Sequence, residues 1–158
     1  MAKALPRNAD VADQLDLLAD LSELLGDEGF RVLAYRRAAT RVREPPASIA
    51  ELALAGEAKG LPGIGKTIEG KIVEIVETGE IAALTRRKEI APPEVVAFLR
   101  LPGIGPKTAA RIWRELGVTT LAELREAAEH ERLRTLSGLG ARSEEKILKA
   151  LAAGLGAE

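Results

Sequence analysis

The sequence contains no cysteine, a single histidine and only 3% aromatic residues. Without cysteine there is no disulfide and no thiolate metal site, and one histidine argues against a zinc site. No apolar run reaches the roughly 18 residues of a membrane-spanning helix, and the first residues lack the apolar core of a signal peptide. We therefore expect a cytoplasmic protein with neither a membrane partner nor a small-molecule cofactor.

The residues that are present favour helices. Hydrophobic residues make up 46% of the chain and are almost all Leu, Ile, Val and Ala. Together with Glu and Arg, Leu and Ala are strong helix formers, and the long alternating β-branched runs typical of strands are absent. With 158 residues the chain can form one domain or two small ones. The sequence predicts an all-α fold.

The charged residues are segregated along the chain. The net charge is −1, which argues against a uniformly basic protein. Residues 8–30 nevertheless carry acids and no base, whereas residues 31–43 carry five arginines and no acid: Arg31, Arg36, Arg37, Arg41 and Arg43. This asymmetry indicates one face for an anionic partner and another turned away from it. Ordinary solvated helix faces are the alternative interpretation.

A five-residue phrase occurs three times. LPGIG stands at Leu61–Gly65 and again at Leu101–Gly105, and LSGLG at Leu136–Gly140 is a degenerate copy. Each copy precedes a basic residue, a hydroxyl residue and a helical run; the pairs are Lys66-Thr67, Lys107-Thr108 and Arg142-Ser143.

The phrase predicts a small cradle for an anion. Two glycines around one aliphatic residue permit a tight turn, so the aliphatic side chain can enter the core while the glycine N–H groups point outward. The following helix N-terminus adds a positive dipole end, and the basic residue neutralises charge on a ligand such as a backbone phosphate.

Helical periodicity and turn residues divide the chain into short helices. We expect helices at 8–26, 30–43, 48–54, 67–78 and 81–89, and then at 94–100, 106–116, 121–129 and 143–151, with a helical turn at 131–135. The second helix should stop before Pro45-Pro46.

Pro92-Pro93 is the best candidate for a linker. It predicts domains at 8–90 and 94–152, the first with one repeated phrase and the second with two. Phe30, Phe98 and Trp113 are predicted core residues, and His130 a surface residue.

The repeated phrase resembles the helix-hairpin-helix motif of DNA repair and replication proteins. In those proteins such hairpins hold backbone phosphates through main-chain N–H groups, and they therefore position DNA without reading its sequence. The resemblance also implies a monovalent cation, Na⁺ or K⁺, on turn carbonyls near Leu61, Ile64, Leu101 and Ile104. No other cofactor is required.

The order of motifs resembles the N-terminal region of bacterial family X DNA polymerases, the DNA polymerase beta type. AYRRAA at Ala34–Ala39 precedes the first phrase, and Lys71 and Thr78-Gly79 follow it. TTLAEL at Thr119–Leu124 stands behind the second phrase. The resemblance extends from about residue 10 to 151. It implies a lyase-type domain that grips the 5′-phosphate side of a DNA gap, and a fingers domain that holds the primer side, in base excision repair at the nucleoid with other repair proteins as partners.

The resemblance assigns phosphate contacts to twelve residues. They are Arg31, Tyr35, Arg36, Lys59, Gly63, Gly65, Lys66, Thr67, Gly103, Gly105, Lys107 and Thr108. The negative Glu144-Glu145 pair opposes phosphate at the third hairpin, which is therefore expected to be mainly structural.

The resemblance also places Lys71 where lyase-proficient members carry the lysine that forms a Schiff base with a 5′-deoxyribose phosphate. Such a lysine must be desolvated or crowded by cations to be neutral, here by Lys59, Lys66, Arg31 and Arg36. However, Thr67 and Ala83 replace basic residues of the family, so Lys71 could equally contact phosphate without reacting.

Polymerisation is not expected of this chain. Nucleotidyl transfer needs clustered carboxylates for two metal ions, yet every aspartate lies between positions 10 and 27. A part of a longer polymerase and a separate binding protein both fit this pattern. Three functions remain open: a DNA-binding module for gaps or nicks with a 5′-phosphate, a deoxyribose-phosphate or abasic-site lyase, and a scaffold for protein contacts.

Overall fold

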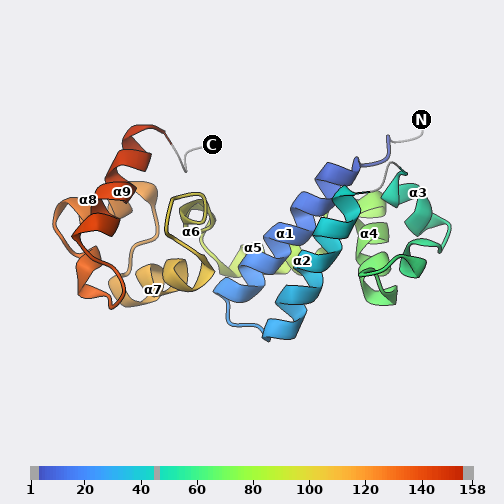
Figure 1. Cartoon of the computed structure of the whole chain (residues 1–158), viewed down its shortest axis with the longest axis horizontal. Helices are drawn as coiled ribbons and strands as arrows, with labels where there is room; N and C mark the ends of the chain where they lie inside the picture. Colours follow the sequence, from blue (N-terminus) through green and yellow to red (C-terminus); the bar gives the residue numbers. More distant parts are fainter. Residues whose placement is uncertain (1–3, 45–46, 155–158) are drawn as a thin grey trace. The chain divides into compact units, whose positions relative to one another are not determined.

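The computed structural model describes residues 4–44 and 47–154 (Figure 1). Within these ranges the chain forms nine α-helices, two short 3₁₀ helices and no strand. The predicted all-α fold is therefore confirmed. No helix in the described ranges is long and apolar enough to cross a membrane. The chain divides into two compact units, 1–89 and 90–158, and the division lies just before the proposed linker prolines.

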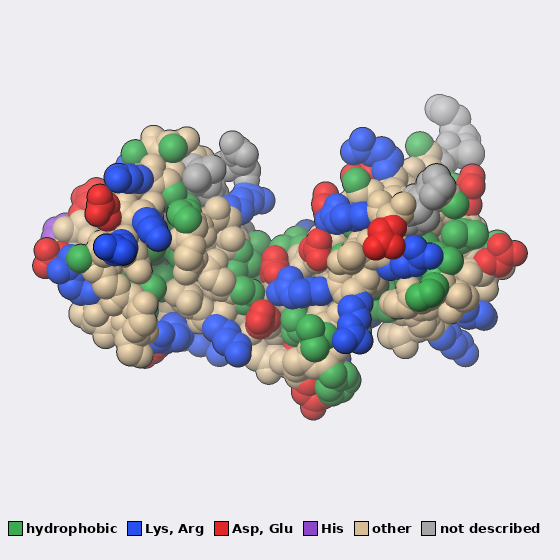
Figure 2. Space-filling model, viewed as in Figure 1, with side chains coloured by type: hydrophobic (Ala, Val, Ile, Leu, Met, Phe, Trp, Pro, Cys, Tyr) green, Lys and Arg blue, Asp and Glu red, His purple; other side chains and the backbone are tan. Residues whose placement is uncertain are grey.

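The first unit is built on an antiparallel pair, α1 (Asn8–Leu24) and α2 (Gly29–Arg43). Val11, Leu15 and Leu18 recur at helical spacing, form an apolar stripe along α1 and are completely buried. The pair is tied by charge as well, because Arg36 and Arg43 of α2 reach carboxylates of α1. Figure 2 shows acidic and basic side chains intermixed over this helix pair.

The remaining elements of this unit surround the first hairpin. They are α3 (Ile49–Leu54), η1 (Ala58–Gly60), α4 (Lys66–Thr78) and α5 (Ala82–Ile90). The Ser48 hydroxyl accepts the Glu51 N–H and caps α3, and Gly79 at φ 91° ends α4. The Gln14 amide donates to the Gly79 carbonyl and accepts the Ile81 N–H. This side chain therefore anchors the α4–α5 turn to α1.

The second unit contains the other two hairpins. Its elements are α6 (Pro93–Phe98), α7 (Pro106–Leu116), α8 (Leu121–Glu129), η2 (Leu133–Thr135) and α9 (Ala141–Ala152). Phe98, Ile112, Leu124 and Leu133 are fully buried and form the centre of a separate core. Phe98 is thus a core residue, as predicted.

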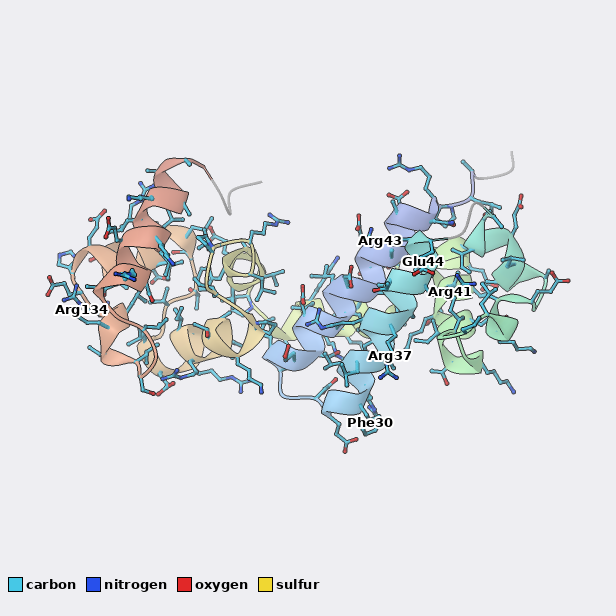
Figure 3. All side chains as sticks on the ribbon, in the orientation of Figure 1. Phe30, Arg37, Arg41, Arg43, Glu44 and Arg134 are labelled. Atoms are coloured by element: carbon cyan, nitrogen blue, oxygen red, sulfur yellow. The ribbon has the colours of Figure 1, made fainter. Side chains whose placement is uncertain are left out.

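Several local predictions need correction. Phe30 is 66% exposed and not in the core, because it lies in the first turn of α2 and points away from α1 (Figure 3). Trp113 is only half-buried, with the Arg114 guanidinium 5.2 Å from its ring centroid. The last helix begins at Ala141, two residues before the predicted start. His130 is exposed, as expected. Pro45-Pro46, the predicted stop of the second helix, lie outside the described residues.

Candidate nucleic-acid interface

The three hairpin turns share one backbone conformation. Gly63, Gly103 and Gly138 have φ values of 85°, 78° and 89°, in the left-handed region that favours glycine. In each turn the aliphatic residue donates its N–H to the carbonyl of the leucine three positions earlier: Ile64 to Leu61 at 3.0 Å, Ile104 to Leu101 at 3.3 Å and Leu139 to Leu136 at 3.1 Å. Ile64 and Ile104 are buried. The predicted plug enters the core, and the degenerate third copy keeps the turn.

Each turn leads directly into a helix N-terminus. Gly65, Gly105 and Gly140 are the N-caps of α4, α7 and α9, and no side chain caps these helices. The Glu69 N–H donates to the Gly65 carbonyl at 2.9 Å, so the N–H groups of Gly65, Lys66 and Thr67 have no acceptor in the described ranges. These are the orphan donors of a helix start, and an anion can accept them.

A buried glutamate supports the first and third hairpins. The Glu69 carboxylate is 8% exposed and accepts the Lys59 N–H at 2.8 Å. Glu144, 2% exposed, accepts the Arg134 N–H at 3.2 Å and the Arg134 Nε–H at 2.7 Å. Each carboxylate ties a 3₁₀ turn to the helix behind the hairpin. Glu144 is therefore paired within the fold, which corrects our view of it as a charge directed at phosphate.

Sequence reasoning did not foresee this support. A signal was present, since both glutamates stand four residues after the second glycine of their phrase. The second hairpin has the buried Ala109 at that position and lacks the interaction.

Two lysines flank the first turn. Lys59 and Lys66 are exposed and form no ion pair within residues 4–44 and 47–154. They lie with Gly63, Gly65 and Thr67 at one end of α4. The structure thus brings five of the predicted phosphate contacts together.

Lys71 lies farther along α4 in a separate cationic cluster. Its Nζ is 5.8 Å from the centroid of the buried Tyr35 ring. Burial lowers the pKa of Lys71, the nearby Glu74 opposes that shift, and the positive charges of Arg87, Arg86 and Arg31 lower the pKa further. The structure therefore places Arg31, Tyr35 and Lys71 together.

Arg86 and Arg87 were missed by the sequence analysis. Both belong to α5, and Arg87 also pairs with Asp27. The run Arg86-Arg87-Lys88 was a visible signal, but nothing local showed that α5 returns to Lys71.

Arg36 occupies a different position from the other predicted contacts. Its guanidinium lies 3.0 Å from Asp20 and 3.4 Å from Glu23 on α1. Arg43 similarly pairs with Asp13 at 2.9 Å and Asp16 at 2.8 Å. Much of the charge segregation seen along the sequence is thus compensated within the α1–α2 pair.

The second and third hairpins are joined by one side chain. Arg111 of α7 donates an Nη1–H to the Ser137 carbonyl at 2.7 Å and an Nη2–H to the Ser137 hydroxyl at 3.4 Å. Lys107, behind the second turn, is exposed, while Thr108 is half-buried. Gly103, Gly105, Lys107 and Thr108 therefore lie together around the second turn, within the second unit.

Comparison with known proteins identifies the motif. A family profile described as a helix-hairpin-helix domain matches residues 6–81, and one described as a SAM-like helix-hairpin-helix tandem matches residues 95–153. DNA polymerase/3′-5′ exonuclease PolX of Bacillus subtilis (strain 168) is 37% identical over 142 residues, covering 90% of this chain and 24% of that protein. The chain belongs to the helix-hairpin-helix proteins of the family X DNA polymerase type.

More distant relatives agree with this placement. DNA polymerase lambda of Rattus norvegicus is 28% identical over 123 residues, covering 78% of this chain and 20% of that protein. DNA nucleotidylexotransferase of Ambystoma mexicanum is 31% identical over 123 residues, covering 75% of this chain and 22% of that protein. The chain thus spans about a quarter or less of the length of these relatives. The match agrees with the resemblance to family X DNA polymerases that the order of motifs indicated.

Proposed function

We propose that this chain binds DNA through backbone phosphates, without reading sequence, at gaps or nicks that carry a 5′-phosphate in DNA repair. The observation that carries the proposal is the set of unpaired N–H groups at the start of α4, next to two unpaired lysines. The names of the relatives, which are DNA polymerases, support DNA as the ligand. The second unit would place Gly103, Gly105, Lys107 and Thr108 on another phosphate.

The second glycine of each phrase supports close approach by a ligand. Gly65 and Gly105 have φ values of −95° and −90°, which any residue can adopt. A Cβ at either position would meet no protein atom within 4 Å. Neither the backbone nor the packing therefore requires glycine there. A phosphate seated on the adjacent N–H groups would require it, because a side chain would occupy the space of the ligand.

Preference for a 5′-phosphate follows from the cluster around Lys71. A terminal phosphate carries roughly −1.5 to −2 charges near neutral pH, against one charge for an internal diester. Arg31 and Arg86 each lie close enough to Lys71 to lower its pKa, so cationic side chains gather around this lysine. Such a cluster stabilises a dianion more than a diester.

Binding to matched duplexes tests the proposal. Fluorescence anisotropy should be measured across a salt series on a one-nucleotide gap with a 5′-phosphate, the same gap with a 5′-hydroxyl, and intact duplex. We expect salt-dependent binding, strongest on the phosphorylated gap. Equal affinity for all three DNAs would contradict gap preference, and absent or salt-insensitive binding would favour a scaffold for protein contacts.

The substitution Gly65→Ala tests the cradle itself. It should lower the free energy of unfolding by about 1 kcal/mol or less, because alanine is a poorer N-cap than glycine. It should weaken DNA binding about tenfold by blocking the N–H groups, as loss of one phosphate contact does. Unchanged binding would remove the α4 N-terminus from the interface.

A deoxyribose-phosphate lyase is the second candidate, favoured by the lowered pKa of the half-buried Lys71. Its neutral Nζ would attack the C1′ aldehyde of a 5′-deoxyribose phosphate, and loss of water would form an imine. A base then removes a C2′ proton, and the C3′–O bond breaks to release the phosphorylated DNA end. Burial and neighbouring cations supply the uncharged amine that the first step needs.

Borohydride trapping tests this activity. The intact chain should form a covalent adduct with gapped DNA bearing a 5′-deoxyribose phosphate, and Lys71→Ala should not. Lys107→Ala, in the other unit, is the matched control and should still be trapped. If DNA binds but no adduct forms, the chain is a binding module without lyase activity.

We also propose Na⁺ or K⁺ on the hairpin carbonyls. The Ile64 and Ile104 carbonyls accept no hydrogen bond from the residues described, and those of Leu61 and Leu101 accept only the turn N–H. A carbonyl oxygen has a second lone pair available. Leu61 and Ile64 in the first hairpin, and Leu101 and Ile104 in the second, therefore each fit a monovalent cation, whose charge would offset that of a phosphate. Tighter DNA binding in K⁺ than in tetramethylammonium at equal ionic strength would support the site, and equal binding would contradict it.

A further inference from the structure

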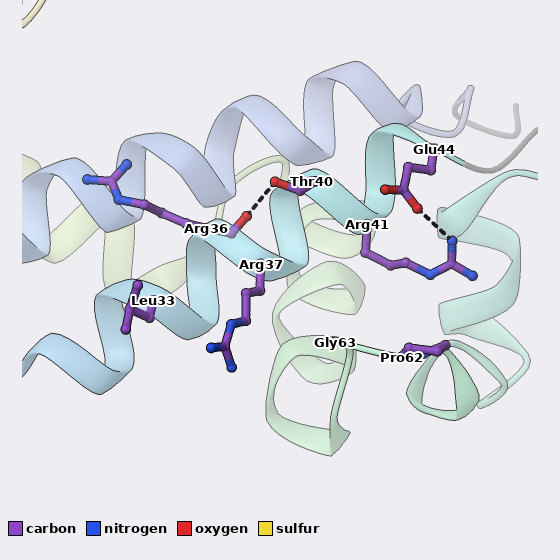
Figure 4. Close-up of a pocket in the computed structure, with 8 residues that line it drawn as sticks. All are labelled: Leu33, Arg36, Arg37, Thr40, Arg41, Glu44, Pro62 and Gly63. Carbon is purple, nitrogen blue, oxygen red and sulfur yellow. Dashed lines mark hydrogen bonds and ion pairs between the residues drawn. The ribbon is translucent and has the colours of Figure 1, made fainter.

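A groove runs between α2 and the turn of the first hairpin (Figure 4). It has a volume of about 410 Å³, with Leu33, Arg37 and Arg41 of α2 on one side and Pro62 and Gly63 on the other. Figure 3 places Arg37 and Arg41 on the side of α2 that faces the hairpin. Neither arginine is among the phosphate contacts that the family resemblance implies.

The two arginines have unused hydrogen-bonding capacity. Arg37 is exposed and has no ion pair or side-chain hydrogen bond in the part of the chain that the structure describes. Arg41 donates one Nη–H to Glu44 at 3.1 Å, while its buried Nε has no acceptor there. A donor withdrawn from water without a partner is unfavourable. The other Nη–H groups of Arg41 make no hydrogen bond within the described residues and can donate to an acceptor in the groove.

The contrast with Arg36 and Arg43 is informative. All four residues belong to α2, but Arg36 and Arg43 are neutralised by carboxylates of α1. Arg37 and Arg41 are one helical turn apart and therefore share a face, the face that meets the hairpin. On this face, Arg37 and Arg41 are not compensated by carboxylates of α1 in the described residues.

The shape of the groove suits a narrow chain. The hairpin backbone at Gly63 lies next to α2, because a Cβ built there would be in ordinary contact with it, 3.8 Å from the Arg37 carbonyl and 3.9 Å from the Arg41 Cβ. Leu33, 54% exposed, and Pro62 add apolar surface. Guanidinium groups bind phosphate oxygens in a fork-like geometry, and the apolar carbons can contact a sugar.

We infer that Arg37 and Arg41 hold a second backbone phosphate of the DNA strand whose first phosphate lies on the N–H groups of Gly65 and Lys66. This inference rests on the proposed function. Continuity favours DNA over an acidic peptide, because Gly63 belongs both to the groove and to the turn that forms the first phosphate site.

The test uses the full chain and gapped DNA in which single phosphates are replaced by neutral methylphosphonates. The dissociation constant should be measured for the wild-type chain, Arg37→Gln, Arg41→Gln and the control Arg43→Gln. Neutral linkages at two distinct positions should weaken wild-type binding. In Arg37→Gln, a neutral linkage at one of these positions should no longer weaken binding. The affinity of this variant for unmodified DNA should be about tenfold lower, and the slope of log affinity against log salt concentration should be smaller by about one. Arg43→Gln should match the wild-type chain.

The outcomes separate this inference from the proposed function. If the wild-type chain binds DNA and Arg37→Gln keeps its affinity and its methylphosphonate profile, the groove is not a phosphate site and the proposed function stands. If the wild-type chain does not bind DNA, both fail. If poly-glutamate binds the wild-type chain but not Arg37→Gln, the groove belongs to an acidic peptide. Arg37 is exposed, so its variant tests the inference even if Arg41→Gln does not fold.

Discussion

At the scale of single residues, the hairpins depend on glycines that serve two different purposes. Gly63, Gly103 and Gly138 adopt a left-handed φ that strains other residues. The second glycine of each phrase has an ordinary φ and open space around it, which a ligand can use. The sequence shows both glycines of a phrase as equal, and the distinction between them follows only from the backbone.

The first prediction compares two glycines of the first unit. Gly63→Ala should lower the free energy of unfolding by about 1–2 kcal/mol, because alanine is strained at φ 85°. Gly70 lies within α4, and a Cβ there would meet nothing within 4 Å. Gly70→Ala should therefore raise the free energy by about 0.5–1 kcal/mol. Chemical denaturation measures both, and a stabilising Gly63→Ala would contradict the assigned turn.

The second prediction concerns Lys71 and pH. Its pKa in the folded protein is below the ordinary value of 10.5, so between these two pKa values the unfolded chain binds more protons than the folded chain. The contribution of Lys71 to the free energy of unfolding therefore rises with pH across that window. Lys71→Met should remove this rise from the pH dependence of stability.

Nuclear magnetic resonance of dimethylated lysines would measure the pKa directly. The Lys71 signal should titrate below pH 10.5, the ordinary pKa of a lysine. Titration at or above that pH would contradict the desolvation of Lys71, and with it the physical basis of the lyase candidate.

At the scale of elements, the hairpin is a turn held between two short helical segments. The buried Glu69 joins η1 to α4 through the Lys59 N–H, and Glu144 joins η2 to α9 in the same way. These hydrogen bonds set the entry of the chain into the turn, and with it the direction of the N–H groups. The second hairpin achieves a closely similar turn without a glutamate, since α6 takes the place of the 3₁₀ turn.

The third prediction tests this support. Glu69→Ala should destabilise the protein by about 1–3 kcal/mol, because it leaves the Lys59 N–H without its acceptor. It should also weaken DNA binding. Glu77→Ala is the control, since Glu77 is exposed on the same helix, and it should change stability by less than about 0.5 kcal/mol. Equal effects of the two substitutions would show that the buried carboxylate is not needed.

At the scale of the whole molecule, the chain is two units that each have their own core and their own hairpins. The first is centred on residues such as Leu15 and Leu18, and the second on residues such as Phe98 and Ile112. If both units bind phosphate as proposed, their connection in one chain raises affinity through effective concentration, because binding of one brings the other close to the same DNA.

The fourth prediction follows from that division. Polypeptides covering residues 1–89 and 90–158 should each be helical by circular dichroism and unfold cooperatively. Each should bind gapped DNA more weakly than the full chain, by about 10²-fold or more. An unfolded fragment would contradict the independence of the cores. Full affinity in one fragment would show that the other unit does not contact DNA.

Local patterns in the sequence were enough to predict the main helices, the turns and the family of this protein. Helix periodicity, glycine conformation and capping are local, so LPGIG, Ser48 and Gly79 could be interpreted from their neighbours alone. The tertiary structure decided which charges remain for a ligand. Arg36 and Arg37 are adjacent in sequence, but α1 neutralises one and the hairpin groove receives the other. Arg86 likewise reaches Lys71 only because α5 folds back. Coulombic and hydrogen-bonding partners depend on distance in space, which a single sequence does not contain.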